Sequence, residues 1–207
     1  MLYQPVLDDP VGYIAGAGHD NRIVLGALLE LLLITANIGT AVVIFPIVRR
    51  QNEELSLGYV TARLFGCMFI LVGIVTLRQE AAGPDEGTVA YTLAAIKDWT
   101  FLLGPGWVVG WGNGLILGYL MYRSGLVPRR MTWLALVGGP LIILSGTLVM
   151  FDVASPGGTL QGLATIPEGL WELSLGVYCT VKGFKATAPI LRANARDGRP
   201  AMAAAPA

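Results

Sequence analysis

The 207-residue sequence predicts an all-α protein, a polytopic bundle of transmembrane helices with five spans. Its composition is 54% hydrophobic and only 14% charged, whereas a soluble globular domain carries about 25% charged residues. The mean hydropathy is +0.63. The apolar residues also gather in continuous runs, each near the ~20 residues that a helix needs to cross ~30 Å of hydrocarbon. Strands of a membrane β-barrel would instead show alternating segments of ~10 residues.

Each run has recognisable limits in the sequence. The first follows a polar amino-terminal stretch and holds a single charged residue, a glutamate, and the second follows "QNEELSLG" and holds a single arginine. The third lies between "KDW" and the turn "RSGLVPRR", and the fourth ends before the turn "DVASPGG". The fifth contains "PEGLWELSLG" and stops near "KGFK". The predicted spans are 23–45, 59–77, 100–122, 131–151 and 163–184.

The distribution of Lys and Arg predicts how the chain is threaded. With the amino terminus outside, ten of these residues fall on the cytoplasmic side and three outside, as the positive-inside rule requires. Residues 1–22 are then an extracytoplasmic segment, 23–185 form the bundle, and 186–207 form a disordered cytoplasmic tail. The segment 78–99, with "RQEAAGPDEGTVAY", has the composition of an outer loop. We expect a multi-pass protein of the inner (plasma) membrane with a cytoplasmic carboxyl terminus.

Three carboxyl groups within the spans are the first candidate site. At ~1.5 Å of rise per residue, Glu30 lies ~10 Å from the outer surface, Glu168 ~8 Å and Glu172 ~13 Å. Glu168 and Glu172 share a helix face because they are four residues apart. We therefore expect the three carboxyls to meet in one layer. Intramembrane charges usually face the bundle or water and often mark function, so a proton or cation site is one interpretation of this layer. We rank it below the other, in which the carboxyls form hydrogen bonds with facing helices, Trp99, Trp107 or Tyr91, and only hold the bundle together.

A second polar layer is predicted nearer the cytoplasm. Asn37 and Asn113 lie ~20 Å from the outer side, and Arg63 lies ~6 Å from the inner end of its helix. These three side chains can form a hydrogen-bonded set. Because an arginine at this depth can also extend to lipid phosphates, we rank that interpretation of Arg63 slightly higher.

Glycines recur every four residues along the third span and predict a surface for close helix packing. We expect this surface to pack within the bundle, with a homodimer interface as the alternative. Pro105 in this span and the Gly138–Pro140 stretch in the fourth are expected to kink or loosen their helices. The glycines are Gly106, Gly110, Gly114 and Gly118.

Four blocks in order resemble the domain-of-unknown-function 4386 family of bacterial membrane proteins. They are "GALLELLLITANIGTAVVIFPIVRRQNEELSLGYVTAR", "DWTFLLGPG", "GYLMYRSGLVPR" and "PEGLWELSLGVYCTVKGF". The resemblance covers nearly the whole chain and implies an integral membrane protein without an established activity. Members of that family usually begin with one further apolar helix, which would make six spans, so we expect a shortened start here.

The sequence also narrows the function classes. The single histidine, His19, precedes the first span, so a bis-histidine haem, an HExxH zinc site and a Ser–His–Asp triad are not available within this chain. We expect no metal and no cofactor, and the absence of a basic stripe argues against a nucleic-acid partner. The expected partner is the lipid bilayer, with a homo-oligomer as an open alternative. Small-solute or proton-linked ion transport is the leading hypothesis, ahead of an accessory subunit and of a lipid-active enzyme.

Overall fold

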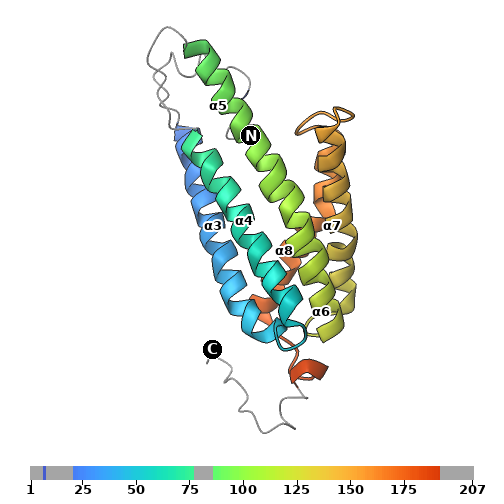
Figure 1. Cartoon of the computed structure of the whole chain (residues 1–207). Coiled ribbons are helices and arrows are strands. Elements are labelled where there is room, and N and C mark those ends of the chain that lie inside the picture. The colour runs from blue at the N-terminus through green and yellow to red at the C-terminus, as the bar shows by residue number, and fades with distance from the viewer. Residues whose placement is uncertain (1–6, 8–20, 77–85, 192–207) are drawn as a thin grey trace.

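The computed structural model of the protein describes residue 7 and residues 21–76 and 86–191, and the regular elements of that part are all helices (Figure 1). In chain order they are α3 (Asn21–Val48), α4 (Glu53–Thr76), α5 (Glu86–Phe101), η1 (Leu102–Val108), η2 (Gly110–Leu117), α6 (Gly118–Ser124), α7 (Arg129–Met150) and α8 (Thr159–Val181). The predicted all-α polytopic bundle is confirmed.

Four helical stretches in the described part are long and apolar enough to cross a membrane. They are Asn21–Val48, Glu53–Thr76, Thr88–Ser124 and Arg129–Met150. The fifth predicted span corresponds to α8, whose 23 residues are sufficient in length but which is not among the four most apolar stretches. Its two glutamates and several small or polar residues lower its hydropathy.

The segment predicted as the outer loop 78–99 is largely helical, which corrects the prediction. The helix begins at Glu86 and runs without a break into the third span, so that Thr88–Ser124 forms a single helical stretch of 37 residues. Residues 77–85 lie outside the described part. The acidic composition of "RQEAAGPDEGTVAY", with its Gly and Pro, favoured a loop, but Lys97 later in the same segment is buried inside the bundle at 3% exposure.

The middle of this long helix has π geometry in η1 and η2. Pro105 lies inside η1 and has no N–H to donate, so one ordinary i→i−4 bond is missing there. The backbone widens instead, and the N–H of Val109 bonds to the carbonyl of Gly104, five residues earlier. The expected disturbance at Pro105 is thus a change of helix type. In α7, the helix continues through Pro140.

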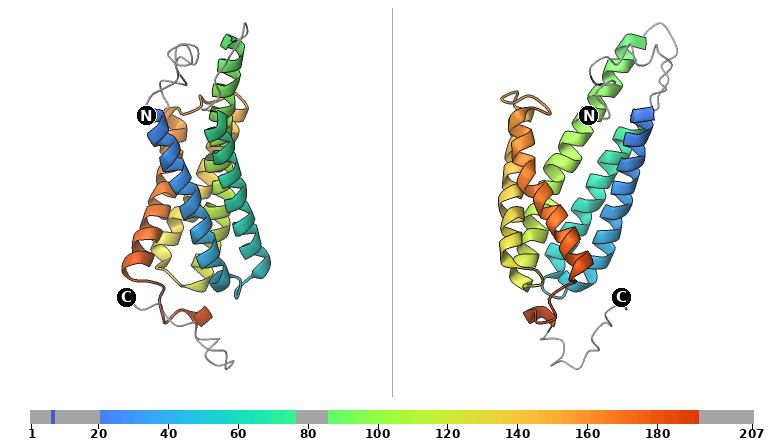
Figure 2. Two further views of the ribbon diagram at one scale, coloured as in Figure 1. Left: turned by 90° about the vertical axis from the view of Figure 1, so that its left-hand side faces the viewer. Right: turned by 180° about the vertical axis from the view of Figure 1, so that it is seen from behind.

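The helices form a curved row in which neighbours along the chain pack side by side (Figures 1 and 2). The long helix from α5 to α6 lies in the middle, α4 packs on one side of it and α7 on the other. α3 packs on α4, and α8 packs on α7. The two outermost helices, α3 and α8, do not pack against each other along their length.

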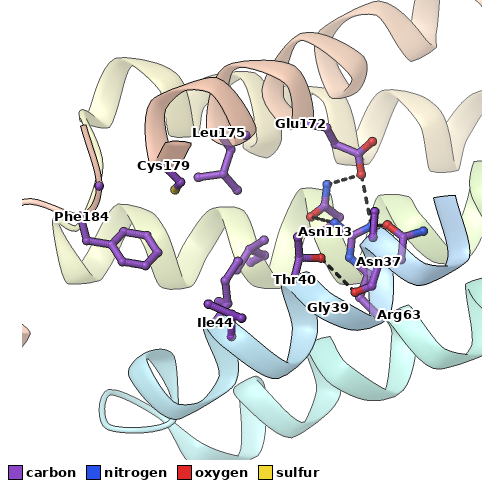
Figure 3. Close-up of a pocket in the computed structure, with 15 residues that line it drawn as sticks. Asn37, Gly39, Thr40, Ile44, Arg63, Asn113, Glu172, Leu175, Cys179 and Phe184 are labelled. Atoms are coloured by element: carbon purple, nitrogen blue, oxygen red, sulfur yellow. Dashed lines mark hydrogen bonds and ion pairs between the residues drawn. The ribbon is translucent and has the colours of Figure 1, made fainter. Parts of the chain in front are cut away.

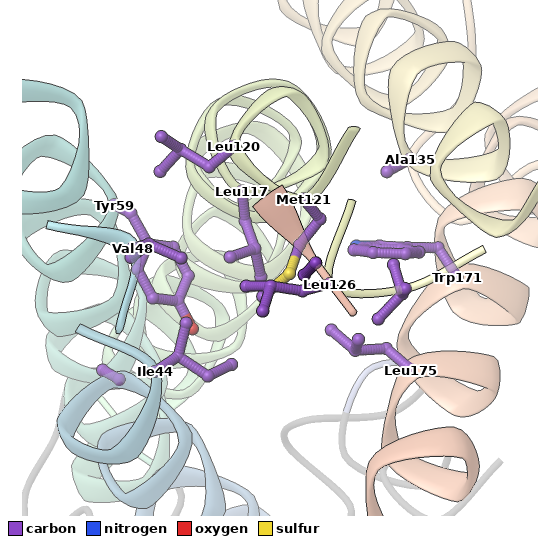
Figure 4. Packing of buried hydrophobic residues seen from close by; sticks show 13 residues of the cluster. Ile44, Val48, Tyr59, Leu117, Leu120, Met121, Leu126, Ala135, Trp171 and Leu175 are labelled. Atoms are coloured by element: carbon purple, nitrogen blue, oxygen red, sulfur yellow. The ribbon is translucent and has the colours of Figure 1, made fainter. Parts of the chain in front are cut away.

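A hydrophobic core closes the end of the bundle where α3 turns into α4 (Figure 4). Its largest fully buried side chains include Tyr59, Leu117, Met121, Leu126 and Trp171. The chain after α8 joins this core, which shortens the predicted tail 186–207. Ala188 is 2% exposed within the core, and the N–H of Lys185 bonds to the carbonyl of Leu126. Residues 192–207 lie outside the described part.

Candidate functional site

Arg63 on α4 is the centre of a buried set of polar side chains. Its Nη1 donates to Asn37 Oδ1 on α3 at 2.7 Å and to Glu172 Oε1 on α8 at 3.3 Å. Its Nη2 donates to Asn113 Oδ1 on η2 at 2.8 Å. The guanidinium, only 8% exposed, therefore joins four helices.

Asn113 connects this guanidinium to two carboxyl groups. The side chain is 1% exposed, and its Nδ2 donates to Glu168 Oε1 at 3.0 Å and to Glu172 Oε1 at 2.8 Å. The amide accepts from the cation on one side and donates to the acids on the other, so all of its observed bonds agree with one orientation. We call these five residues the polar cluster: Asn37, Arg63, Asn113, Glu168 and Glu172.

Missing side chains on two neighbouring helices make room for the carboxyl of Glu168. A Cβ added to Gly114 on η2 or to Gly138 on α7 would lie 3.0 and 3.1 Å from Glu168 Oε2. Glu168 is 2% exposed, and in the described part of the chain its Oε2 has no hydrogen-bond partner. A buried, half-satisfied carboxyl is energetically unfavourable, and such groups usually have a functional explanation.

A pocket of about 450 Å³ opens beside the polar cluster, between α3 and α8 (Figure 3). Its polar end is formed by Asn37, Arg63, Asn113 and Glu172. The rest is lined mainly by apolar or small residues: Ala36, Gly39, Thr40, Val43, Ile44, Leu117, Leu175, Gly176, Cys179, Gly183 and Phe184. The pocket is the space between the two outermost helices, α3 and α8, and the central helix lines it through Asn113 and Leu117. Volumes of this size are common for small-molecule sites.

Glu172 is the most accessible member of the polar cluster. Its side chain is 41% exposed, whereas that of Arg63 is 8% exposed. Glu172 also lines a second, shallow depression along the outer surface of α8. Its carboxyl is therefore reachable from the pocket, whereas Glu168 is buried and is connected to the pocket by its hydrogen bond with Asn113.

Glu30 does not belong to this cluster, which corrects the prediction of one layer of three carboxyls. Lys97 Nζ on α5 donates to Glu30 Oε1 at 2.7 Å and to Oε2 at 2.8 Å, and both side chains are at most 10% exposed. The ammonium lies next to Gly73 on α4. Because Gly73 follows Arg63 by ten residues, the two polar groups are about 15 Å apart along that helix.

The other expectations about polar contacts are also decided by the structure. Arg63 does not extend to lipid phosphates, the interpretation ranked higher, because its guanidinium is occupied inside the bundle. It forms the hydrogen-bonded set with Asn37 and Asn113, which Glu168 and Glu172 join. Within the described residues, the carboxyls accept hydrogen bonds from Arg63, Lys97 and Asn113. Trp107 Nε1 donates to Thr147 Oγ1 on α7 instead.

Three of the four predicted packing glycines lie against α7 within the bundle. A Cβ on Gly110 would approach the carbonyl of Gly139 to 2.9 Å, one on Gly114 would approach Gly139 Cα to 2.5 Å, and one on Gly118 would approach Ala135 Cβ to 2.7 Å. Gly106 has no such neighbour; its nearest atom is 3.7 Å away. Gly104 and Gly112, which fall outside the predicted four-residue spacing, allow the same close approach to α4.

Lys97 and the pocket lining were also missed. The signal for Lys97 was present, because "YTLAAIK" holds one charge in an otherwise helix-forming stretch. The pocket has no sequence signal, since its walls come from four separate helices.

Within the described residues, no group of three His, Cys, Asp or Glu side chains is arranged to hold a metal ion. His19 lies outside those residues.

Fold and site together define the class: an integral membrane protein whose helices enclose an Arg–Asn–Glu cluster at the end of a pocket. The chain belongs to the family described as Domain of unknown function (DUF4386), whose sequence model matches residues 1–183. The resemblance seen in the sequence is thereby confirmed. No curated protein and no solved structure matches the chain.

Proposed function

We propose that this protein is a transporter that couples movement of a small solute to exchange of a proton at Glu172 and Glu168. The observation that carries the proposal is the composition of the polar cluster: two carboxyl groups share one guanidinium at the end of a pocket. The proposed location is the inner membrane, with the carboxyl terminus in the cytoplasm.

The charge of the cluster supports proton exchange. If both carboxyls are ionised, Arg63 balances one of them and one negative charge is left over. Uncompensated charge is costly inside a membrane protein, so the site favours either a proton or a cationic partner. The other titratable side chains near the cluster or in the pocket, Tyr59, Cys67 and Cys179, are neutral in their ordinary state.

The arrangement of the two glutamates supports exchange between the pocket and the interior. Glu172 faces the pocket, Glu168 is buried, and the amide of Asn113 bonds to both. A proton that neutralises Glu172, or a cationic solute that pairs with it, therefore changes the hydrogen bonds available to Asn113, Arg63 and Glu168. Because these residues lie on different helices, binding can bias how the helices are arranged.

The experiment is proton movement in proteoliposomes that contain a trapped pH-sensitive dye. A potassium diffusion potential drives the protons when no solute is added. A gradient of Na⁺ or ethanolammonium drives them in the other two conditions, because one-for-one exchange of such a cation for a proton moves no net charge. We expect proton movement to exceed that of protein-free vesicles in at least one condition, and to fall several-fold in Glu172→Gln and Glu168→Gln. Glu54→Gln is the matched control, because Glu54 is exposed at the start of α4.

Equal proton movement in wild type and in both cluster variants, under every condition, would overturn the proposal. That result, with all variants folded, would favour a structural or accessory role for the cluster. Correct folding is checked by a single symmetric peak in size-exclusion chromatography and by the thermal transition of each purified variant.

A further inference from the structure

We propose that the solute is an amphiphilic cation, an ammonium group attached to an apolar chain, which enters the pocket sideways from the bilayer. This inference rests on the proposed function, whose solute it names. It depends on three properties of the pocket: an elongated apolar part, an open acceptor at the polar end, and a mouth among lipid-facing side chains.

The shape of the pocket fits a molecule with a polar head and an apolar tail. Figure 3 shows Glu172, Asn113, Asn37 and Arg63 together at one end, while Leu175, Ile44, Cys179 and Phe184 extend away from them. An apolar chain in this part gains the free energy of burial without leaving polar groups unpaired. A fully polar solute would leave most of the lining unused.

The polar end selects a cation over an anion. The Nη atoms of Arg63 are occupied by Asn37, Asn113 and Glu172, and its Nε, although unpartnered in the described part, is a buried atom. The guanidinium therefore has few N–H groups left to donate to an anionic head group. Glu172 Oε1 accepts bonds from Arg63 and Asn113, whereas no bond to Oε2 occurs within the described residues.

An ammonium group is the complement of that free oxygen. It donates hydrogen bonds to a carboxylate and brings the positive charge that the cluster lacks. The same charge can be supplied by a proton on one of the glutamates. Cation and proton are thus alternatives at one site, which is the relation that exchange transport needs.

The mouth of the pocket opens on the apolar surface of the bundle. Gly39, Thr40 and Val43 of α3 line the pocket and are exposed, as is Gly176 of α8. The adjacent positions in the sequence of α3 and α8 carry exposed apolar side chains: Val42 at 66%, Leu173 at 65% and Val177 at 55% exposure. A molecule dissolved in the bilayer can therefore reach Glu172 without crossing water.

Two glycines allow the pocket to be narrowed without disturbing the fold. A Cβ added to Gly39 or Gly176 meets no atom within 4 Å, although both residues line the pocket. Leucine is also a better helix former than glycine. Gly176 lines both the pocket and the depression on the outer surface of α8, so Gly176→Leu should narrow the mouth of the pocket and leave α8 intact. Gly162→Leu is the matched control, because Gly162 is equally unobstructed on α8 and lines neither of the two pockets described above.

The experiment compares decylammonium, decanol and decanoate, which share one chain and differ in charge. Binding to the full-length protein in lipid nanodiscs is measured by equilibrium dialysis at neutral pH, after subtraction of binding to empty nanodiscs. We expect saturable binding of decylammonium that is about tenfold tighter than that of the other two compounds. Glu172→Gln should weaken it about tenfold and Gly176→Leu should abolish it. Glu54→Gln and Gly162→Leu should bind as wild type does.

Tighter binding of decanoate, equal binding of amine and alcohol, or unchanged binding in Gly176→Leu would overturn the inference. If Glu172→Gln does not fold, the Gly176→Leu and Gly162→Leu pair still decides the question. Proton movement that depends on Glu172 without any decylammonium binding would refute this inference alone. Decylammonium binding without proton movement under its gradient would refute the proposed transport and leave a binding site.

Discussion

Asn113 is the residue on which the polar cluster depends most. It takes part in three interhelical hydrogen bonds, with Arg63, Glu168 and Glu172, whereas Asn37 takes part in one with Arg63. Interhelical bonds in membrane proteins contribute about 0.6 kcal/mol each on average. We expect Asn113→Leu to lower the free energy of unfolding by roughly 2 kcal/mol and Asn37→Leu by less than about 1 kcal/mol. Thermal unfolding in detergent measures both, and equal losses would contradict this ranking.

The ion pair between Glu30 and Lys97 allows a second prediction at the same scale. Removing one partner of a buried pair leaves an uncompensated charge and costs roughly 3–5 kcal/mol, while replacing both with apolar residues can be neutral. We expect Glu30→Leu and Lys97→Met each to destabilise the protein strongly, and the double variant to recover most of that loss. A double-mutant cycle measures the coupling, and strictly additive losses would refute the pairing.

At the scale of the element, the long helix from α5 to α6 is held by glycines that touch α7. Gly114→Ala would place a Cβ 2.5 Å from Gly139 Cα, so the helices must separate, at a cost of about 1–3 kcal/mol. Gly106→Ala meets nothing closer than 3.7 Å and should be neutral or slightly stabilising, since alanine favours helix. Thermal unfolding of the two variants tests this, and a larger loss at Gly106 would contradict the described packing.

The same helix shows what the sequence could and could not predict. Hydropathy located the apolar runs because burial in lipid depends on composition alone. It failed for residues 86–99, which follow the acidic, Gly- and Pro-bearing stretch that indicated an outer loop. Lys97 is tolerated inside because Glu30 neutralises it, and Glu30 lies on a helix distant in sequence. The predicted outer loop 78–99 contains Lys97, so the prediction leaves Glu30 without a partner inside the bundle. Equal depth is then the only reason to group Glu30 with Glu168 and Glu172.

For the polar cluster, the sequence predicts correctly those residues whose depth along their helices is enough to place them together. Helix rise predicts Arg63, Asn37 and Asn113 at one level, and hydrogen bonding among them is one of the two interpretations that this depth allows. The addition of Glu168 and Glu172 depends on how α8 packs against Gly138 of α7, which helix rise alone does not predict. The pocket depends on the separation of α3 and α8 and therefore on the whole arrangement.

At the scale of the whole molecule, the direction of insertion is testable. The turn with Arg49 and Arg50 and the chain after α8 lie at the same end of the bundle (Figure 1), and the distribution of Lys and Arg predicts that this end faces the cytoplasm. We expect a carboxyl-terminal fusion to green fluorescent protein to fluoresce and a fusion to alkaline phosphatase at the same place to be inactive. Active phosphatase with a dark fluorescent fusion would reverse the orientation.

The glycines at the mouth of the pocket have one more consequence. Gly39 and Gly176 contribute no side chain to the opening, so at these two positions its width depends on the distance between the backbones of α3 and α8. The width of the solutes that can enter would then depend on the distance between α3 and α8. A larger side chain at Gly39 or Gly176 would set a fixed upper limit on solute size.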